Sequence, residues 1–469
     1  MNSFLKTLGS LPENPGHGLP DTLDLPFPVA LGLISVLTDS VLKDSYPGRS
    51  LRVFSELQGG LYLGFFLDET LSAVTRVPEQ AEPDSFFFLE SHFACPPALT
   101  QHIPDILLEF PAPPENRAPP SAAPALAPNI TVKLYFRPDL PRDFAARILA
   151  ALDSSPQDTS HIFSRENGLS PEAVRLLPDY QAFRDTVLRA QERMQQGIFH
   201  KVVLSRRAEI VLKTAPNLTD LFQNLISRRL TTAQSDCYFY ARLAGPEDTL
   251  FFSFSPETLL HSRGREFRTE ALAGSCPPGQ GSSLLQDSKN IQENSIVVEE
   301  IKERLAELTL SLRIGPLTLK SLDYIEHLKT PISGLLKEGI SPLKVSQKLH
   351  PTPAVLGFPR EPALGFLRDE GLLPESLYAG LGGFLKTGAS AKEDRLTLAV
   401  LLRAARAHSR VITLYGGAGI LPASRPESEW RETGSKMKAA MEALSLPRDL
   451  TSIITALPAG TASGRLQIN

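Results

Sequence analysis

Residues 179–212 read DYQAFRDTVLRAQERMQQGIFHKVVLSRRAEIVL and place a helix-like segment directly before a strand-like one. Apolar residues recur with helical spacing over residues 179–196, and Gly197 is placed to end the helix. Residues 200–212 are rich in β-branched side chains and predict a long strand. This stretch indicates a fold in which helices pack beside long strands.

The same patterns extend along the chain in both directions. Several strand-like runs follow one another between helices, without the strict alternation of a parallel βαβ fold. This order favours a mixed α+β fold with antiparallel sheet. The patterns predict strands at residues 51–57, 61–68, 86–94, 130–136, 250–256, 395–405 and 411–415, and helices at residues 293–308 and 427–444.

Proline content divides the chain. Eight prolines fall within residues 104–128, and because proline fixes φ and lacks an N–H donor, this segment predicts an extended linker. Residues 1–150 form a sheet-rich N-terminal region without clustered chemical groups. Residues 175–446 hold the candidate functional residues, and residues 447–469 are expected to be an irregular C-terminal tail.

Composition narrows the class of protein. The 469 residues are 42% hydrophobic and 21% charged, as in ordinary globular proteins. The net charge of −4 supplies no positive field for a nucleic acid. Three widely spaced cysteines, Cys95, Cys237 and Cys276, suit a reducing compartment. No apolar run approaches the ~20 residues of a membrane helix, and the N-terminus lacks a signal-peptide core. A cytoplasmic protein is therefore expected.

Three glutamates lie on apolar helix faces. Glu293 precedes Val297 by one turn, and Glu429 and Glu432 are three residues apart on one helix surface. Carboxylates that face inward are costly unless they are paired or bind a cation, and Mg²⁺ prefers a few carboxylates with substrate oxygens. The alternative is a first-turn glutamate and a surface ion pair of Glu432 with Lys436.

Two further residues suit acid–base chemistry. Lys201 opens the strand-like run KVVLS, and Glu257 follows the run FSFSP. A buried lysine near other cations can act as a base, and a carboxyl among apolar residues can act as an acid. The alternatives are a lysine at a strand end whose ammonium reaches solvent, and a first-turn helix glutamate after Pro256.

Small residues form two predicted loops that expose backbone N–H groups to an anion. These are LAGS at residues 272–275 and GGAGI at residues 416–420. Arg403 lies in LLRAA, a predicted apolar strand. A buried arginine needs an anionic partner, so a substrate carboxylate is a candidate.

These residues together resemble the chorismate-utilising enzymes, which include isochorismate, anthranilate, aminodeoxychorismate and salicylate synthases. The matching segments occur in the family's order and cover about residues 179–444. They are KVVLSR at Lys201, FSPETLL at Phe254, TEALAGS at Thr269, KNIQENSIVVEEI at Lys289, LHPTPAVLGFP at Leu349, YAGLGG at Tyr378, LLRAA at Leu401, YGGAGI at Tyr415 and ESEWRETGSKM at Glu427.

Within that family the sequence is most similar to isochorismate synthases of the menaquinone type. Asn294 stands where many relatives have histidine, and Ala354 stands where aminating and salicylate-forming relatives tend to have threonine. Asn290 replaces an acidic residue of other branches, which puts one water-mediated Mg²⁺ contact in question. The resemblance implies a large α+β sandwich of antiparallel sheets, the chorismate-binding fold of anthranilate synthase component I, with a variable N-terminal region.

The resemblance also implies a reaction and roles for the residues. Water attacks C2 of chorismate while the C4 hydroxyl leaves, with Lys201 as base and Glu257 as acid. Mg²⁺ holds the ring carboxylate. Glu293 and Glu432 are implied as direct ligands of the ion, and Glu429 is implied to assist through water. The resemblance implies that Gly274 and Ser275, with Lys436 nearby, bind the ring carboxylate. It implies that the enolpyruvyl carboxylate is bound by Tyr378, Arg403, Gly417 and Gly419. His350 is implied to line the site.

Three rival interpretations remain open. The scaffold also suits anthranilate or aminodeoxychorismate formation with a glutaminase partner, and salicylate synthesis with release of pyruvate. A protein that binds chorismate without turnover is the third. For the isochorismate synthase interpretation we expect a monomer with no glutaminase subunit, no nucleic acid and no membrane contact, whose pathway is menaquinone synthesis or another route from isochorismate.

Overall fold

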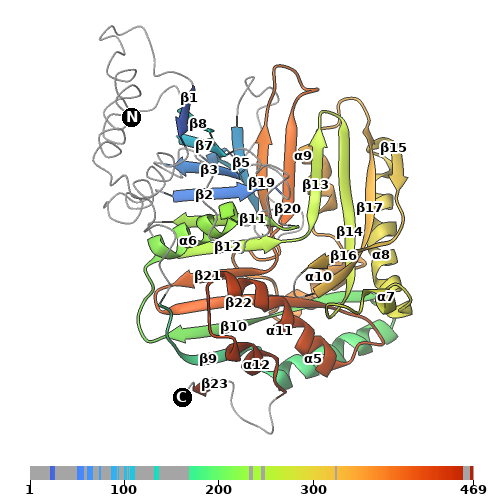
Figure 1. Cartoon of the computed structure of the whole chain (residues 1–469). Helices are drawn as coiled ribbons and strands as arrows, with labels where there is room; N and C mark the ends of the chain where they lie inside the picture. The colour runs from blue at the N-terminus through green and yellow to red at the C-terminus, as the bar shows by residue number, and fades with distance from the viewer. Residues whose placement is uncertain are drawn as a thin grey trace, which may run out of the picture.

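The computed structural model describes residues 168–457 except 232–235, 245–248 and 323–324. It also describes short segments between residues 22 and 136, chiefly strands, and a strand at residues 465–467. Two large antiparallel sheets dominate this part of the chain, and their strands run in crossing directions (Figure 1). The antiparallel α+β fold expected from the sequence is confirmed.

The first sheet contains the long strand that the sequence predicts at residues 200–212. This strand, β10 (Lys201–Leu212), pairs along most of its length with β22 and over residues 207–212 with β9. In spatial order the described strands are β1 (Thr22–Pro26), β8 (Thr131–Phe136), β7 (Ile106–Phe110), β3 (Leu61–Phe66), β2 (Ser50–Ser55), β11 (Tyr238–Ala244), β12 (Thr249–Ser255), β21 (Ala404–His408), β22 (Val411–Ile420), β10 (Lys201–Leu212), β9 (Pro171–Leu177) and β23 (Arg465–Gln467), and β18 (Gly357–Phe358) pairs with β10.

The second sheet is built around β14 and β17, two long strands that pair with each other. Most of its strands were not detected from the sequence. In spatial order they are β15 (Thr309–Ile314), β17 (Ile325–Leu336), β14 (Glu266–Cys276), β13 (Thr258–Arg263), β20 (Arg395–Val400), β19 (Leu381–Lys386), β5 (Phe86–Ser91), β6 (Thr100–His102) and β4 (Ala73–Val74), and β16 (Thr318–Leu322) pairs with β17.

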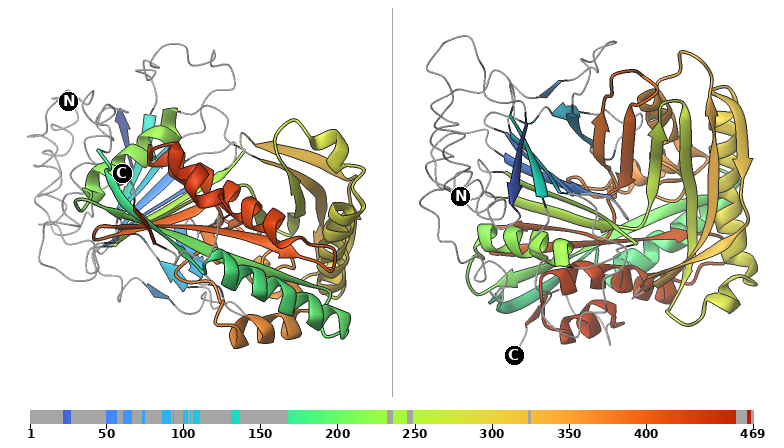
Figure 2. Two further views of the ribbon diagram at one scale, coloured as in Figure 1. Left: turned by 90° about the horizontal axis from the view of Figure 1, so that it is seen from below. Right: turned by 45° about the horizontal axis from the view of Figure 1, so that its top comes forward.

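Helices cover the two sheets. The predicted helices at residues 179–196, 293–308 and 427–444 are present as α5, α8 and α11, and Asp179 caps the first by accepting the N–H of Ala182. α11 packs on β22, and α8 packs on β14 and β17 (Figure 2). The described helices are α5 (Tyr180–Gln195), α6 (Leu218–Thr231), α7 (Gly281–Leu284), α8 (Ser288–Ala306), α9 (Pro342–Leu349), α10 (Arg360–Asp369), α11 (Pro426–Ala443) and α12 (Asp449–Thr455).

The N-terminal strands extend the sheets of the rest of the chain. β2 pairs with β11 in the first sheet, and β5 pairs with β19 in the second. β7 occupies residues 106–110, so this part of the predicted linker at residues 104–128 is a paired strand, and residues 111–128 lie outside the described residues. The expected irregular tail instead contains α12 and β23, which pairs with β9.

The single strand predicted for residues 395–405 is wrong. β20 ends at Val400 in the second sheet, and β21 starts at Ala404 in the first sheet. The connection between them therefore carries the chain from one sheet to the other. Arg403 lies in this connection rather than in a strand, with a left-handed φ of 53°.

The buried apolar residues form two clusters: the first joins the first sheet to its helices, and the second contains residues from both sheets. In the first, Arg206 lies over the ring of the fully buried Trp430, 3.7 Å from the ring centroid, and donates to Thr433 Oγ1 at 2.6 Å. These contacts fasten α11 to the sheet. Among the described helices none is long and apolar enough to cross a membrane.

Candidate active site

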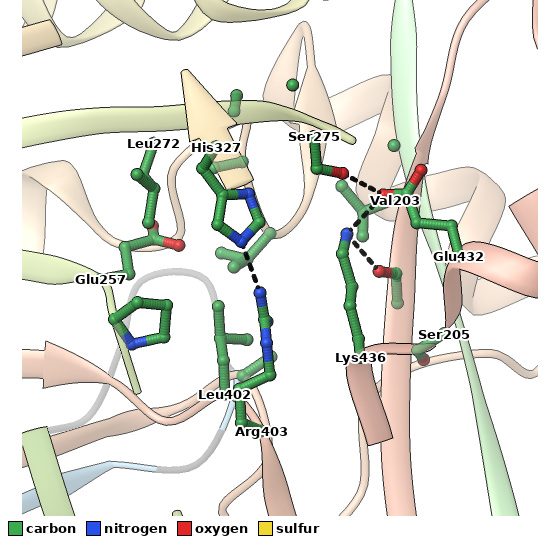
Figure 3. Close-up of a pocket in the computed structure, with 18 of the residues that line it drawn as sticks. Val203, Ser205, Glu257, Leu272, Ser275, His327, Leu402, Arg403, Glu432 and Lys436 are labelled. Atoms are coloured by element: carbon green, nitrogen blue, oxygen red, sulfur yellow. Dashed lines mark hydrogen bonds and ion pairs between the residues drawn. The ribbon is translucent and has the colours of Figure 1, made fainter. Parts of the chain in front are cut away.

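A pocket forms where the two sheets and α8 and α11 meet (Figure 3). It brings together residues that are more than 200 positions apart in the chain. Ten of the predicted site residues line it: Glu257, Gly274, Ser275, Glu293, Tyr378, Arg403, Gly417, Gly419, Glu432 and Lys436. Other lining residues include Val203, Ser205, Leu272, His327 and Leu402.

The two predicted small-residue loops are parts of strands. Residues 416–420 belong to β22, and residues 272–275 belong to β14, where the pairing with β17 shifts register. Gly274 adopts a φ of +84° at this irregularity, and a Cβ there would lie 3.0 Å from the backbone oxygen of Asn290. Asn290 accepts the N–H of Ser275 at 3.1 Å. An irregular strand, held by α8, therefore replaces the expected loop.

Lys201 and Glu293 form a buried ion pair beside the pocket. Lys201 Nζ lies 2.9 Å from Glu293 Oε1, and the side chains are 0% and 12% exposed. Lys201 itself is outside the pocket lining, whereas its partner Glu293 belongs to the lining. Gly419, on the neighbouring strand, leaves the room for both side chains, because a Cβ there would lie 2.8 Å from Lys201 Cε.

Glu257 lies in the connection between β12 and β13, where the chain passes from the first sheet to the second. The helix of the alternative interpretation does not form. The backbone N–H of Glu257 donates to Ser255 Oγ at 3.2 Å, and the carbonyl of Glu257 accepts the N–H of Val400 at 3.2 Å. Burial, together with the charge of Glu270, raises the pKa of Glu257 to about 7. This carboxyl is therefore half protonated near neutral pH and can deliver a proton.

Arg403 reaches the pocket from the connection between the sheets and meets His327, a residue that the sequence did not single out. Its Nη2 lies 2.8 Å from His327 Nε2. Because arginine can only donate, this nitrogen accepts and the imidazole is neutral. Burial and the adjacent Arg403 hold the pKa of His327 well below its usual range. The two side chains form one buried polar wall of the pocket (Figure 3).

Glu432 and Lys436 project from one face of α11 into the pocket. They form an ion pair at 2.7 Å, and Glu432 also accepts from Ser275 Oγ at 2.8 Å. Lys436 donates to the carbonyl of Gly417 at 2.9 Å. Although burial opposes it, Lys436 lowers the pKa of Glu432. The pair expected as a surface alternative thus exists, but it joins β14, β22 and α11 inside the site.

The third glutamate, Glu429, is 1% exposed and points inward as its helical position predicts. It lies outside the pocket lining and pairs with Lys289 at 2.8 Å. Burial tends to lower the pKa of Lys289, but the nearby charges of Glu429, Glu293 and Glu432 raise it above its usual value. The negative charges of Glu293, Glu429 and Glu432 therefore all favour the protonated form of Lys289.

That arrangement bears on the metal predicted from the sequence. The described residues contain no ready group of three or more His, Cys, Asp or Glu side chains that could hold an ion. Each of the three glutamates instead pairs with a lysine. The charges of all three glutamates act on Lys289, and carboxylate oxygens are the donors that Mg²⁺ prefers. The donor chemistry of the three glutamates suits such an ion, while in this structure lysine ammonium groups are their partners.

His350 and Tyr378 differ in how they relate to the pocket. His350 is fully buried and does not line the pocket, and among the described residues neither ring nitrogen has a hydrogen-bond partner. Burial lowers its pKa to about 3. Tyr378 lines the pocket and stacks on Tyr415 with ring centroids 5.0 Å apart. A Cβ at Gly417 would lie 3.1 Å from the Tyr378 hydroxyl.

Sequence reasoning assigned no supporting role to the residues that hold the site together, and it noted Asn294 only as a departure from many relatives. Asn294 donates to the carbonyls of Ala271, Ala273 and Leu328, which joins α8 to β14 and β17. Glu270, within the quoted segment TEALAGS, is 6% exposed and received no role. It stands between Thr269 and Ala271, two positions after Arg268, so no local apolar pattern marks it as buried.

Comparisons with known proteins show which family this chain belongs to. The family model described as chorismate binding enzyme matches residues 130–445. Isochorismate synthase MenF of Escherichia coli K12 is 33% identical over 268 residues, which are 55% of this chain and 59% of that protein. Isochorismate synthase EntC of the same strain is 29% identical over 299 residues, 62% of this chain and 74% of that protein.

A solved structure of the menaquinone-specific isochorismate synthase MenF from Escherichia coli has the same fold. The two structures superpose with a TM-score of 0.71 at 23% sequence identity. The superposition covers 94% of this chain and 99% of the MenF chain. The family match extends over more than half of the chain and contains nearly all of the pocket. This chain belongs to the family of chorismate-binding enzymes.

Proposed function

We propose that the protein is an isochorismate synthase, an isomerase that adds water at C2 of chorismate and removes the C4 hydroxyl. The names of its sequence relatives support this reaction. The structural observation that carries it is Glu257, a buried carboxyl with a pKa of about 7, in a pocket that also contains Arg403. An acid for the leaving hydroxyl and a cation for a substrate carboxylate are what the reaction requires.

Glu257 protonates the departing C4 oxygen in this proposal. Loss of hydroxide from a ring carbon is unfavourable, and a positioned acid lets water leave instead. The carboxyl can carry its proton near pH 7 because its charged form is disfavoured by burial and by Glu270. After protonating the oxygen, the carboxylate is stabilised by Arg403, Lys201 and Lys320, whose charges lower its pKa.

Lys201 takes the proton from the water that attacks C2. It is fully buried, and its ammonium is held against Glu293 at 2.9 Å. In this proposal its amine nitrogen receives the proton, and its position at the start of β10 keeps it fixed relative to the strand that flanks the pocket. The side chain of Lys201 packs closely against Gly419, which limits the motion of the lysine.

The substrate's two carboxylates bind cationic and N–H groups. Arg403, with Tyr378 and the strand around Gly417 and Gly419, receives the enolpyruvyl carboxylate. Gly274 and Ser275 receive the ring carboxylate, with Lys436 beside them. His350 is fully buried and is not part of the pocket lining, so its contribution is to packing.

Glu293 and Glu432 would hold Mg²⁺ directly, and Glu429 would assist through water. When bound, the ion supplies positive charge for the ring carboxylate. Lys289 holds Glu429 at 2.8 Å and Lys436 holds Glu432 at 2.7 Å, so these lysines fix the positions of the two carboxylates. The donor set contains only carboxylates, as a hard cation prefers.

The proposal extends to the protein's setting. We place it in the cytoplasm, acting as a monomer without a glutaminase subunit, and we place the reaction at the entry to menaquinone synthesis, by analogy with MenF. Salicylate synthesis and amination of chorismate are the competing reactions on the same scaffold.

Incubation of the purified protein with chorismate and Mg²⁺, followed by separation of the products, tests the function. Isochorismate as the sole product supports the proposal. Release of pyruvate without an added lyase would identify a salicylate synthase. An aminated product formed only with ammonia would identify the aminating branch, and binding of chorismate without any product would identify a non-catalytic protein.

A further inference from the structure

The peptide groups on either side of Glu257 are held by two charged side chains from the second sheet. Lys320, on β16, donates a hydrogen bond to the carbonyl of Pro256. Glu270, on β14, accepts the N–H of Thr258 at 2.9 Å. The backbone is therefore fixed by a charged group directly before and directly after the carboxyl that lines the pocket.

These two side chains also pair with each other. Lys320 Nζ lies 3.7 Å from Glu270 Oε1, and the residues are 9% and 6% exposed. Lys329, on β17, approaches Glu270 Oε2 at 3.0 Å and is 31% exposed at its side chain. The three charges come from three strands of one sheet, so the cluster has little freedom to rearrange.

Stability alone is a weak reason for this cluster. Removing two charges from water is costly, and a buried ion pair often stabilises a fold no better than apolar side chains of similar size. Directional hydrogen bonds to the backbone are what apolar residues cannot supply. The cluster supplies two of them, and both flank the same residue.

We propose that Glu270 and Lys320 are positioning residues for Glu257, which fix the backbone of the acid and set the charge that it experiences. The inference rests on the proposed function, because it assumes that Glu257 donates the proton to the leaving oxygen. Neither residue lines the pocket, so both act through Glu257.

The charges that face Glu257 give the two residues opposite electrostatic effects. After burial, Glu270 is the group that raises the pKa of Glu257, whereas Arg403, Lys201 and Lys320 lower it. Removing the Glu270 charge therefore favours the ionised, inactive acid. Removing the Lys320 charge favours the protonated acid.

The test compares Glu270→Gln and Lys320→Met with the wild-type protein in pH profiles of chorismate turnover with Mg²⁺. Glutamine keeps an acceptor for Thr258, and methionine keeps the length of lysine. We expect kcat at the optimum to fall about tenfold to a hundredfold in both, with KM changed less than kcat, since small displacements of catalytic groups have effects of this size. The alkaline limb should move to lower pH in Glu270→Gln and to higher pH in Lys320→Met.

Two further variants keep the test decisive. Lys329→Met removes a partly exposed charge beside Glu270, so it should fold even if the buried variants do not, and its alkaline limb should move to higher pH. Glu266→Gln makes the same chemical change as Glu270→Gln at an exposed position of the same strand, and its profile should match the wild type.

The outcomes separate this inference from the proposed function. A wild-type protein that makes no isochorismate overturns the function and, with it, the role of the cluster. Isochorismate formation by the wild type, with kcat and pH limbs unchanged in the cluster variants, overturns only the positioning role. Losses of kcat without opposite shifts of the alkaline limb would reduce the cluster to a structural feature and would also overturn it.

Discussion

Gly419 and Glu293 approach so closely that a Cβ at Gly419 would lie 2.3 Å from Glu293 Oε1. The same Cβ would lie 2.8 Å from Lys201 Cε. Gly419 belongs to β22, which pairs with β10 immediately beside Lys201, so the contact is set by the register of the sheet. Glycine at this position is therefore required by the ion pair of Lys201 and Glu293 rather than by backbone conformation.

Gly419→Ala should force the ion pair apart. The methyl group overfills a packed site, which typically costs about 1–3 kcal/mol of the free energy of unfolding. We expect a lower melting temperature and a kcat reduced by about a hundredfold, because a shift near 1 Å in a reacting group has that effect. Calorimetry and steady-state kinetics measure both.

Gly365→Ala is the matched control for that variant. A Cβ at Gly365, on α10, meets no atom within 4 Å, so the variant should keep full activity and gain slightly in stability. Equal loss of activity in both variants would show that the effect at Gly419 is not specific to the site.

Lys201→Ala should abolish turnover while sparing the metal site. Loss of a positioned base lowers kcat by about 10²–10⁴-fold. The ammonium that neutralises Glu293 is also removed, so Mg²⁺ affinity, measured by isothermal titration calorimetry, should be unchanged or higher. Near wild-type conversion of chorismate would place the base elsewhere. Lys302→Ala, an exposed lysine on α8, serves as control.

Glu257→Gln should remove the alkaline limb of the pH profile. In the wild type we expect kcat to fall as pH rises through about 7, because the acid is then ionised. Glutamine cannot donate a proton to the leaving oxygen, so kcat should drop by about 10²–10⁴-fold at all pH values. A nearly silent substitution would mean that water or another group protonates the oxygen.

The same pKa predicts an effect on stability that does not depend on turnover. The folded protein binds a proton at Glu257 that the unfolded chain, with an ordinary pKa of 4.5, releases. The free energy of unfolding should therefore decrease as pH rises from about 4.5 to 7. Glu257→Gln should lessen this decrease. Melting temperatures recorded across that pH range, compared with those of Glu266→Gln, test it.

The sequence predicts elements better than it predicts partners. Runs rich in β-branched and aromatic residues gave β2, β3, β10 and β12 nearly to the residue, because strand propensity is local. The spacing of apolar residues placed Glu429 on a buried face correctly. Neither pattern contains the register that brings β22 beside β10 across 200 residues.

The errors around the pocket have a common physical cause. Glycine-rich segments were interpreted as loops, yet residues 416–420 are a strand in which glycines make room for neighbouring side chains. Arg403 was placed in a strand because its neighbours are apolar, but the chain changes sheet there. His327 and Lys289 act through contacts with distant residues, and no local pattern marks such contacts.

Glu293→Gln and Glu432→Gln should each weaken Mg²⁺ binding while the fold is kept. Each change removes a negative charge from the carboxylates around Lys289 and leaves the side-chain volume unchanged. Mg²⁺ titration by calorimetry should show lower affinity, and turnover should require more Mg²⁺ or be lost. Glu299→Gln, at an exposed position of α8, should titrate as the wild type does. Full activity of both variants in limiting Mg²⁺ would end the metal assignment.

Arg403→Lys should act mainly on chorismate binding. The guanidinium is a planar fork that can hold a carboxylate with two hydrogen bonds, whereas lysine offers one point charge. Losing one charged hydrogen bond costs about 1.5–3 kcal/mol, which corresponds to a rise in KM of roughly tenfold to a hundredfold. His327 also loses its donor at 2.8 Å, so the polar wall of the pocket loosens further.

Arg410→Lys, at an exposed arginine outside the pocket, provides the control and should leave KM unchanged. Since the expected defect is in substrate binding, raising the chorismate concentration should recover much of the rate in Arg403→Lys. An unchanged KM together with an unchanged kcat would remove Arg403 from the substrate site.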